Sequence, residues 1–345
     1  MNGESAFAWQ PLRLWRRRRT AIVGIIAHAP VDVVADAAEE LLERFAIRKL
    51  HCTTLPLPRS VELAETIEAS GAESRFLPGG CGANMAAWLA RLGSTVSVVA
   101  PFGRDANGDL ARSDLERRGV RVAGFDYDGP HSLIYTLITE DRERTFADYC
   151  HGVRYDLLES AKRLKGEKIV AVDGYLLLRL GAAAGVDVYL RQERPIGQQI
   201  VFAPGDVSVL TDAADACATV LERCSHLVMN RNEAAALFPG GSDTDIVAAL
   251  RARGVSGAIT KGEDGALLFD AAETLHIGSA HLGRPIVNTN GAGDAFTAGY
   301  MHGLDQGLPL SETARIATAC ASEILDSEAA RPAHSSEVFT PAEAG

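Results

Sequence analysis

The chain has 345 residues with a formal net charge of -11, and 47% of its residues are hydrophobic against 23% charged. A chain this acidic lacks the clustered positive charge that binding to phosphate backbones requires, so nucleic acid is not expected as a partner. Its apolar runs fall short of the roughly 18–20 residues that span a bilayer, so we expect no membrane segment and predict a globular, cytoplasmic protein.

An arginine run, Arg16 to Arg19, stands near the beginning of the chain. Such a run is compatible with a nucleic-acid or membrane arm, or with an Arg-rich transit peptide. A solvated leader ahead of the first strand is the simpler interpretation. We therefore predict a flexible basic leader over residues 1–19, one main domain over 20–330 and a C-terminal tail over 331–345.

Short apolar runs rich in β-branched residues alternate with helical patterns along the main domain. The predicted strands are 21–26, 96–100, 168–172, 199–202, 226–229, 257–260 and 266–269. The predicted helices are 83–92, 110–118, 157–164, 212–222, 233–238 and 243–253. This alternation predicts an α/β fold with a doubly wound, mostly parallel sheet flanked by helices. Ligands of such a fold bind at the carboxyl ends of its strands.

Two segments, 46–77 and 121–150, interrupt this order. They carry strand-like alternation, as in Leu133 to Thr139, with a single helical pattern near residues 61–69. Such alternation is typical of half-buried strands. The two segments are therefore predicted to form one small, β-rich unit beside the main sheet.

A glycine loop precedes a carboxylate in the C-terminal third. Gly291 and Gly293 stand just before Asp294, and small and apolar residues recur at helical spacing from Phe296 onward. The loop therefore leads into a helix N-terminus, whose unpaired amides and dipole attract anions such as phosphate oxygens. Asp294 alone could equally be an ordinary helix cap.

A second glycine turn gives the loop a context. Gly79 and Gly80 are separated from Asn84 by three residues, and the helix that follows ends in Ala-Arg-Leu-Gly at Gly93. This pattern resembles the N-terminal signature of the PfkB, or ribokinase, family of carbohydrate and nucleoside kinases. The segment 288–296 is similar to the family's C-terminal signature. Three shorter motifs resemble the family's in the same order, namely Gly-x-Asp-x-x-Gly at 103–108, Asn-x-x-Glu at 230–233 and Thr-x-Gly-x-x-Gly at 260–265.

The resemblance implies a ribokinase-like fold with a small β lid, and an ATP-dependent enzyme that phosphorylates a hydroxymethyl group of a sugar or ribonucleoside. It implies that Asp294 is the base for the accepting hydroxyl, and that Gly291, Ala292 and Gly293 form an anion hole with it. The residues implied for the acceptor are Asp32, Gly79, Gly80, Asn84 and, more weakly, Asp173. Those implied for ATP are Asn230, Thr260, Gly262, Gly265 and Asn290.

The same resemblance implies that Asn230 and Glu233 help to hold Mg²⁺ on the ATP phosphates, through an ion that keeps many of its waters. Taken alone, Glu233 could equally cap the helix that follows. The chain departs from the family pattern at Asn288, where relatives that bind potassium usually carry an aspartate. This loss of a negative charge makes activation by potassium doubtful.

The acceptor is predicted less sharply than the reaction. The Leu77 to Gly80 entry, the Asp173-Gly174-Tyr175 turn and the Ala330-Arg331-Pro332 tail resemble the adenosine-kinase-like branch, which favours a nucleoside. The alternatives are a sugar kinase of the ribokinase, fructokinase or keto-deoxygluconate type, and a non-catalytic regulator that binds a sugar or nucleotide. In each case the partner is a small molecule, and the protein is expected to be a monomer or a homodimer.

Two other chemistries are disfavoured by the sequence. The six cysteines form no Cys-x-x-Cys pair and no zinc-like group with the histidines, so they are expected to be reduced thiols. Cys81 lies in the second glycine turn, but no histidine stands in a recognisable partner motif. A dinucleotide oxidoreductase would need Gly-x-Gly-x-x-Gly after the first strand, where the chain has only Gly24.

Overall fold

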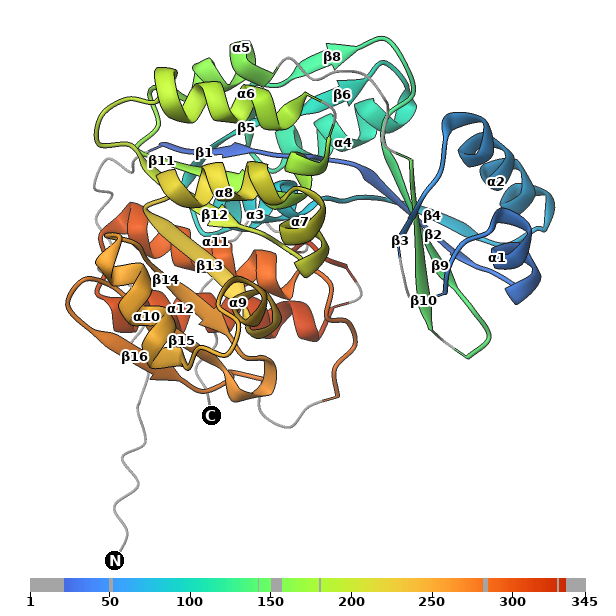
Figure 1. Ribbon diagram of the computed structural model, residues 1–345. Coiled ribbons are helices and arrows are strands. Elements are labelled where there is room, and N and C mark those ends of the chain that lie inside the picture. The colour runs from blue at the N-terminus through green and yellow to red at the C-terminus, as the bar shows by residue number, and fades with distance from the viewer. Residues whose placement is uncertain are drawn as a thin grey trace, which may run out of the picture.

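The computed structural model describes residues 22–49, 52–141, 143–149, 157–179, 181–281, 285–327 and 329–332. The predicted leader and all of the predicted tail beyond residue 332 lie outside these ranges. The described chain forms a large α/β body and a smaller α/β unit beside it, labelled at the right of Figure 1. Within the described part, none of the helices has the length and hydropathy needed to cross a membrane.

The body is built on a nine-stranded sheet with the order β16-β15-β14-β13-β12-β11-β1-β5-β7. Pairing is parallel from β7 to β14, whereas β15 and β16 are antiparallel. The strands are β1 (Ile22–Ile26), β5 (Thr95–Val99), β7 (Arg121–Val122), β11 (Ile169–Asp173), β12 (Gln199–Ala203), β13 (His226–Asn230), β14 (Ser256–Thr260), β15 (Ala266–Phe269) and β16 (Thr274–Ile277). The expected mostly parallel sheet is confirmed.

Helices cover both faces of this sheet, because alternate strand residues such as Ile25 and Ile26 point into two separate apolar clusters. One face is covered by α3 (Cys81–Arg91), α4 (Ala106–Arg117), α11 (Ala292–Gln306) and α12 (Leu310–Leu325). The other is covered by α5 (Leu157–Ala161), α6 (Ala182–Val188), α7 (Val207–Asp212), α8 (Ala214–Arg223), α9 (Arg231–Leu237) and α10 (Asp243–Ala252). The doubly wound arrangement follows from these two buried faces.

The smaller unit has a five-stranded sheet with the order β3-β10-β9-β2-β4. Its elements are β2 (Val31–Asp36), β3 (Cys52–Thr54), β4 (Ser74–Pro78), β9 (Leu133–Ile138), β10 (Arg144–Tyr149), α1 (Glu39–Phe45) and α2 (Leu57–Ala69). Val33, Tyr135 and Leu137 pack on one face with Leu42 of α1 and Leu63 of α2. The two helices thus cover one face of the small sheet and leave the other to face the body.

The small unit differs from the predicted segments 46–77 and 121–150. It begins at Val31, because the chain passes from β1 directly into β2, and β2 pairs with β9 on one side and with β4 on the other. The beginning of the second predicted segment lies elsewhere. β7 pairs with β5 in the large sheet, and β8 (Phe125–Tyr127) pairs with β6 (Pro101–Gly103).

Candidate active site

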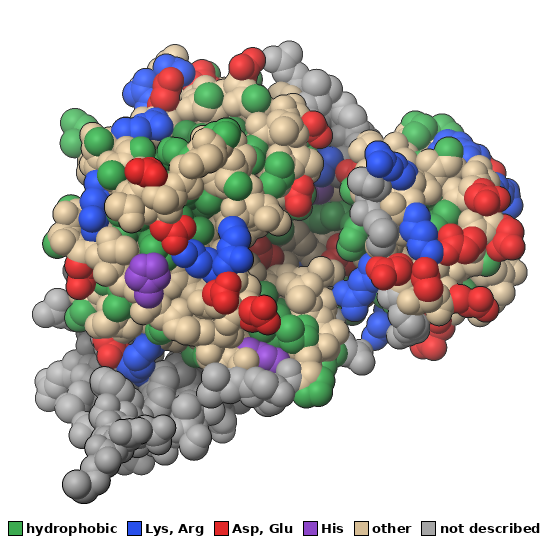
Figure 2. Space-filling model, turned by 60° about the horizontal axis from the view of Figure 1, so that its bottom comes forward, with side chains coloured by type: hydrophobic (Ala, Val, Ile, Leu, Met, Phe, Trp, Pro, Cys, Tyr) green, Lys and Arg blue, Asp and Glu red, His purple; other side chains and the backbone are tan. Residues whose placement is uncertain are grey.

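A cavity of about 1230 Å³ lies between the large sheet and the open face of the small one. Figure 2 shows it as a hollow between the body and the smaller unit, with acidic and basic side chains around its mouth. Asp32 and Thr136 of the small sheet form one wall. The opposite wall carries the segments in which most of the predicted site residues stand.

The carboxyl ends of the parallel strands supply the floor. Asp173, Asn230 and Thr260 end β11, β13 and β14, His28 follows β1, and all four line the cavity. The crevice outside the carboxyl ends of parallel strands is the usual ligand site of an open α/β sheet. The position expected from the strand pattern is therefore the position of the cavity.

Two helices begin at the cavity. Each follows a glycine at a position where no other residue type fits. Gly80 precedes α3 with a φ of 93°, and Gly291 precedes α11 with a φ of 83°. A Cβ atom at Gly80 would lie 2.4 Å from the carbonyl oxygen of His28, and one at Gly291 would lie 2.5 Å from that of Ala330. Only glycine fits such positions. Gly80 and Gly291 both line the cavity, so α3 and α11 begin at the same space.

Asn84 and Asp294 bring these helices together. The Nδ2 atom of Asn84 donates a hydrogen bond of 2.8 Å to Oδ2 of Asp294. Asp294 is partly exposed at the cavity wall, and its desolvation raises the pKa of the carboxyl, opposed by hydrogen bonds from Asn84 and the Cys81 thiol. Burial raises the pKa of Cys81 well above its ordinary value, so this cysteine remains a neutral thiol rather than a nucleophile.

Asp32 approaches from the small sheet. Its carboxylate lies so close to the glycine turn that a Cβ atom at Gly79 would be 2.5 Å from Oδ2 of Asp32. Burial raises the pKa of Asp32 to about 7, Arg331 opposes that rise, and the charge of Asp294 adds to it. A carboxylate of the small sheet and one of helix α11 thus interact electrostatically across the cavity.

Asp173 lines the cavity, but backbone amides already use its carboxylate. Oδ2 accepts from the amides of His28 at 3.2 Å and Gly82 at 3.3 Å, and Oδ1 accepts from that of Tyr175 at 3.1 Å. Burial raises its pKa to about 6. These contacts hold the ends of β1 and β11 against the start of α3, which explains the residue structurally. A contact with the acceptor remains a prediction.

Asn230 and Glu233 form a capping box at the start of α9. Oδ1 of Asn230 accepts from the amides of Asn232 at 2.9 Å and Glu233 at 3.0 Å, while the Glu233 carboxylate accepts from the backbone and side-chain nitrogens of Asn230. Burial raises the pKa of Glu233 to about 7. Both residues line the cavity, so capping and contact with a ligand are compatible for the carboxylate.

The remaining predicted residues divide into two groups. Gly262, Asn290, Gly291 and Gly293 line the cavity together with Thr260. Gly79, Gly265 and Ala292 are not among its lining residues. Gly265 instead allows the tight connection of β14 to β15, since a Cβ atom there would lie 2.0 Å from the carbonyl oxygen of Ile277. No group of three or more His, Cys, Asp or Glu side chains arranged to hold a metal occurs in the described ranges.

Among the cavity residues that were not predicted as site residues, three have notable contacts, and the first is Arg144 at the start of β10. Its Nη1 donates a hydrogen bond of 2.7 Å to Oδ1 of buried Asn288, which also accepts from the amide of Asn290 at 3.0 Å. The small sheet is thereby joined to the glycine loop. The departure at Asn288 was visible in the sequence, but its partner stands 144 positions away.

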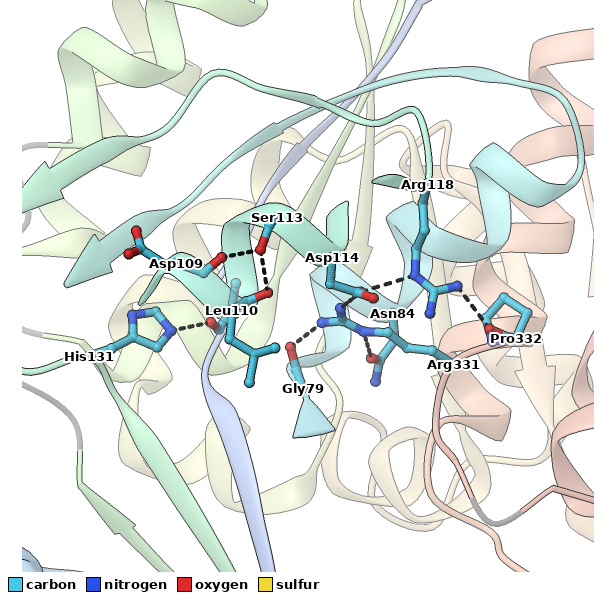
Figure 3. A network of polar contacts seen from close by, with 11 residues as sticks. Gly79, Asn84, Asp109, Leu110, Ser113, Asp114, Arg118, His131, Arg331 and Pro332 are labelled. Carbon is cyan, nitrogen blue, oxygen red and sulfur yellow. Dashed lines mark hydrogen bonds and ion pairs between the residues drawn. The ribbon is translucent and has the colours of Figure 1, made fainter. Parts of the chain in front are cut away.

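The second is Arg331, which the sequence analysis assigned to the tail. It is buried at 5% exposure, and its Nε donates a hydrogen bond of 2.8 Å to Oδ1 of Asn84 (Figure 3). Its Nη atoms donate to Asp114 of α4 and to the carbonyl oxygen of Gly79. The predicted start of the tail is therefore wrong, because the chain after α12 folds back against α3 and α4.

The third is His28, which precedes Asp32 by four residues. Its Nε2 atom is buried and has no hydrogen-bond partner among the described residues. Burial and the charge of Arg179 hold the pKa of His28 well below its ordinary value, so the imidazole is neutral. A neutral, unpaired ring nitrogen in the cavity wall is suited to a polar ligand group. Only its place after the first strand signals this in the sequence.

Comparisons with known proteins show the family to which the chain belongs. A family model described as pfkB family carbohydrate kinase matches residues 58–336. The chain is 29% identical over 260 residues to a ribokinase of Bacillus subtilis, covering 73% of this chain and 82% of that protein. It is 31% identical over 247 residues to an ATP-dependent ribose-1-phosphate kinase of Halopiger xanaduensis, covering 68% and 75%. The structure of an adenosine kinase from Sinorhizobium meliloti has a TM-score of 0.78 at 23% identity, covering 91% and 96%.

Proposed function

The chain belongs to the pfkB family of carbohydrate kinases, and we propose that it transfers the γ-phosphoryl group of Mg-ATP to a hydroxymethyl group of a sugar or ribonucleoside, with Asp294 as the base. One observation carries this proposal. A carboxylate at the first turn of α11 faces the cavity, is held by Asn84, and lies opposite the carboxylate of Asp32. A kinase of this family uses ATP, and its acceptor is a small molecule.

Phosphoryl transfer asks little covalent chemistry of the protein. It requires in-line alignment, neutralisation of charge and a base near the accepting hydroxyl. Asp294 takes the proton from that hydroxyl, and the rise in its pKa brings the carboxylate nearer to the pH at which a base works best. The amides of Gly293 and Asp294 at the start of α11 face the developing negative charge together with the helix dipole, whereas the amide of Ala292 donates to the carbonyl oxygen of Thr289 at 3.3 Å.

The acceptor binds between the two sheets. Asp32 from the small sheet and Asn84 from α3 supply directional groups for its hydroxyls, and unpaired hydroxyls in a buried site are costly. The unpaired Nε2 of His28 adds a further polar contact. These groups come from three separate elements, so an acceptor that satisfies all of them is fixed in one orientation.

Thr260, Gly262 and Asn290 line the part of the cavity proposed to hold ATP. Asn230 and Glu233 differ in the oxygen lone pairs that they can offer to Mg²⁺. Both lone pairs of the Asn230 oxygen accept backbone amides, so Asn230 acts through the cap rather than as a direct ligand. Each oxygen of Glu233 retains a lone pair and suits the waters of a hydrated magnesium ion, which supplies charge neutralisation to the phosphates.

In the glycine loop, the side-chain oxygen of Asn288 is poorly suited to bind a potassium ion. Its side-chain oxygen already accepts from the guanidinium of Arg144 and the amide of Asn290. A positive group at 2.7 Å also repels a second cation. We infer that this enzyme works without a potassium ion bound to that side chain.

A ribonucleoside of the adenosine type is the favoured acceptor. Among the aromatic residues of the small sheet, Phe146 lines the cavity, whereas Tyr135 lies on the helix-covered face and hydrogen-bonds to Ser60. Tyr175 of the body also lines the cavity. Aromatic faces at both walls favour a planar base. The second candidate is a sugar kinase, favoured by the identity with a ribokinase across most of both chains.

An ADP-release assay with Mg-ATP tests the proposal. The acceptor panel contains ribonucleosides, pentoses, hexoses and keto-deoxy sugar acids, and each acceptor is measured with the wild-type protein and with Asp294→Asn. We expect turnover with one acceptor class and a loss of about 10²–10⁴-fold in the variant, which is the usual contribution of a positioned base. Undiminished turnover in Asp294→Asn would remove the base assignment. An acceptor that binds without any ADP release would favour the non-catalytic regulator.

A further inference from the structure

We propose that Arg331 is a positioning residue for the transfer reaction: it fixes the orientation of the Asn84 amide, so that the NH₂ group of Asn84 faces the carboxylate of Asp294. The role depends on the proposed function of Asp294 as the base. Arg331 stands after α12, in the last described part of the chain. Its side chain reaches Asn84 near the N-terminus of α3.

The guanidinium of Arg331 is held from three sides. Its Nε donates to Oδ1 of Asn84 at 2.8 Å, one Nη donates to the carbonyl oxygen of Gly79, and the other pairs with the Asp114 carboxylate. Figure 3 shows the contacts of the Arg331 guanidinium group with Asn84, Gly79 and Asp114. The planar fork of arginine can serve three acceptors in fixed directions, whereas lysine has a single nitrogen. The geometry therefore requires arginine rather than a positive charge alone.

These contacts decide which way the Asn84 amide points. A guanidinium only donates hydrogen bonds, so the atom of Asn84 that meets Nε must be the oxygen, and the nitrogen must then face Asp294. Without Arg331, the amide is able to rotate by half a turn and place its oxygen against the carboxylate. That arrangement would lose a hydrogen bond and set two acceptors against each other.

The buried ion pair has no evident advantage for stability. The side chains of Arg331 and Asp114 are 5% and 6% exposed, and burying such a pair costs desolvation energy that apolar residues would avoid. Arg118 of the following turn also pairs with Asp114, at 3.0 Å, and donates to the carbonyl oxygen of Pro332. This charged cluster of Arg331, Asp114 and Arg118 lies beside the proposed base. Its role is better explained by the orientation of the Asn84 amide toward Asp294 than by a gain in folding stability.

The protonation of Asp294 reports this orientation, because a hydrogen bond donated to a carboxylate favours its ionised form. Other groups around Asp294 act on the same proton and must be held constant. They are Asp32 from β2, Cys81 from α3, Asp173 from β11, Tyr175 from the 3₁₀ helix Gly174–Leu178 that follows β11, and Arg331 itself. The first four stay unchanged in a substitution confined to Arg331 or Arg118, and the charge of Arg331 is tested separately by Arg331→Lys.

The test compares Arg331→Gln with Arg118→Gln. Both substitutions remove an arginine that contacts Asp114, but only the first removes the partner of Asn84. The pH dependence of kcat/KM is measured with the acceptor identified in the ADP-release panel. In Arg331→Gln the acid limb should move upward by about one pH unit, and in Arg118→Gln it should stay in place. Equal shifts in both variants, or none in Arg331→Gln, would overturn the proposal.

Arg331→Lys separates orientation from charge. Lysine retains the positive charge but cannot hold three acceptors, so the acid limb should lie between those of the wild type and Arg331→Gln. A complete return to the wild-type profile would show that charge alone is sufficient, and the orienting role would be lost. The pair of changes Arg331→Met and Asp114→Leu controls for folding. It removes both buried charges together, and the upward shift should persist in it.

A measurement without turnover keeps this inference separate from the proposed function. The side-chain carboxyl of Asp294 is titrated by ¹³C NMR in the full chain, with Asp294→Asn used to assign its signal. Its pKa should rise by about one unit in Arg331→Gln and not in Arg118→Gln. If the wild-type protein turned over no acceptor, the proposed function would fail while this titration still decided the role of Arg331. An unchanged pKa in Arg331→Gln would refute that role.

Discussion

The side-chain nitrogen of Asn84 lies 2.8 Å from a carboxylate oxygen of Asp294, although 210 positions separate the two residues along the chain. This contact joins the first turn of α3 to the first turn of α11. Two helix N-termini, each preceded by a glycine with positive φ, thus open into one cavity. This convergence depends on the backbone at the two glycines, on the buried acids and on the small sheet.

Gly291→Ala should destabilise the protein and reduce turnover. The residue has a φ of 83°, and the added Cβ atom would lie 2.5 Å from the carbonyl oxygen of Ala330. Backbone strain of this kind costs about 1–3 kcal/mol, which denaturant unfolding resolves. Gly293→Ala is the matched control, since it lies within α11 and its added Cβ atom would meet nothing within 4 Å. Equal losses of stability in both variants would contradict the explanation.

The stability of Glu233→Gln relative to the wild type should increase with pH. Burial raises the pKa of Glu233 from its ordinary value of 4.5 to about 7, so between these values the folded state binds more protons than the unfolded state. Stability then falls as pH rises through this window, and the cost reaches about 3 kcal/mol above pH 7. Glutamine retains the capping box but does not ionise. Urea unfolding at several pH values between 4.5 and 8 measures the difference.

Asp245→Asn provides the opposite case for that experiment. Asp245 occupies the equivalent position in the exposed capping box of α10, and hydrogen bonds from Ser242 lower its pKa. Its ionised form is stabilising above its ordinary pKa, and this contribution is lost as pH falls. The asparagine variant should therefore be less stable than the wild type at neutral pH. A Glu233→Gln curve parallel to that of the wild type would show that Glu233 titrates normally.

Arg144→Ala should weaken substrate binding more than it changes the chemical step. The guanidinium joins β10 of the small sheet to Asn288 of the glycine loop at 2.7 Å. A hydrogen bond from a charged group contributes about 1.5–3 kcal/mol, which corresponds to a rise of roughly ten- to a hundredfold in KM. Arg104→Ala removes an exposed ion pair with Asp128 and should leave KM unchanged. A purely kcat effect in Arg144→Ala would refute the coupling of sheet and loop.

Turnover should be the same in potassium and in choline salts of equal ionic strength. The oxygen of Asn288 is already filled by two donors, and one of them carries a positive charge. Initial rates of ADP release at saturating Mg-ATP check this directly. Clear stimulation by potassium alone would mean that the ion binds to other groups of the loop, such as its carbonyl oxygens.

The body of the fold could be predicted from the sequence because its signals are local. The predicted strands 226–229 and 266–269 lie within one residue of β13 and β15, since strands buried on both faces are continuous apolar runs. β2 is not predicted from the sequence, because Asp32 and Asp36 interrupt its apolar residues. The helix α1 has only Leu42 and Phe45 buried, which is a weak helical pattern for seven residues.

The site could be predicted only in part, for a related reason. Asp294, Asn84 and Asp32 stand in recognisable local patterns, and they line one cavity. Arg331 stands in a short segment without periodicity, and its contact with Asn84 spans 247 positions. The unpaired nitrogen of His28 is a property of its surroundings rather than of its neighbours in the chain. Contacts of this kind become visible only when the whole fold is assembled.

The direct passage of β1 into β2 places the two facing carboxylates on separate bodies joined by a short crossing at residues 27–30. Asp32 belongs to the small sheet and Asp294 to helix α11 of the body, so a molecule that binds both connects the two units. A water molecule is too small to bind both carboxylates at once. We therefore expect ATP to be protected from wasteful hydrolysis by the same two side chains that recognise the correct acceptor.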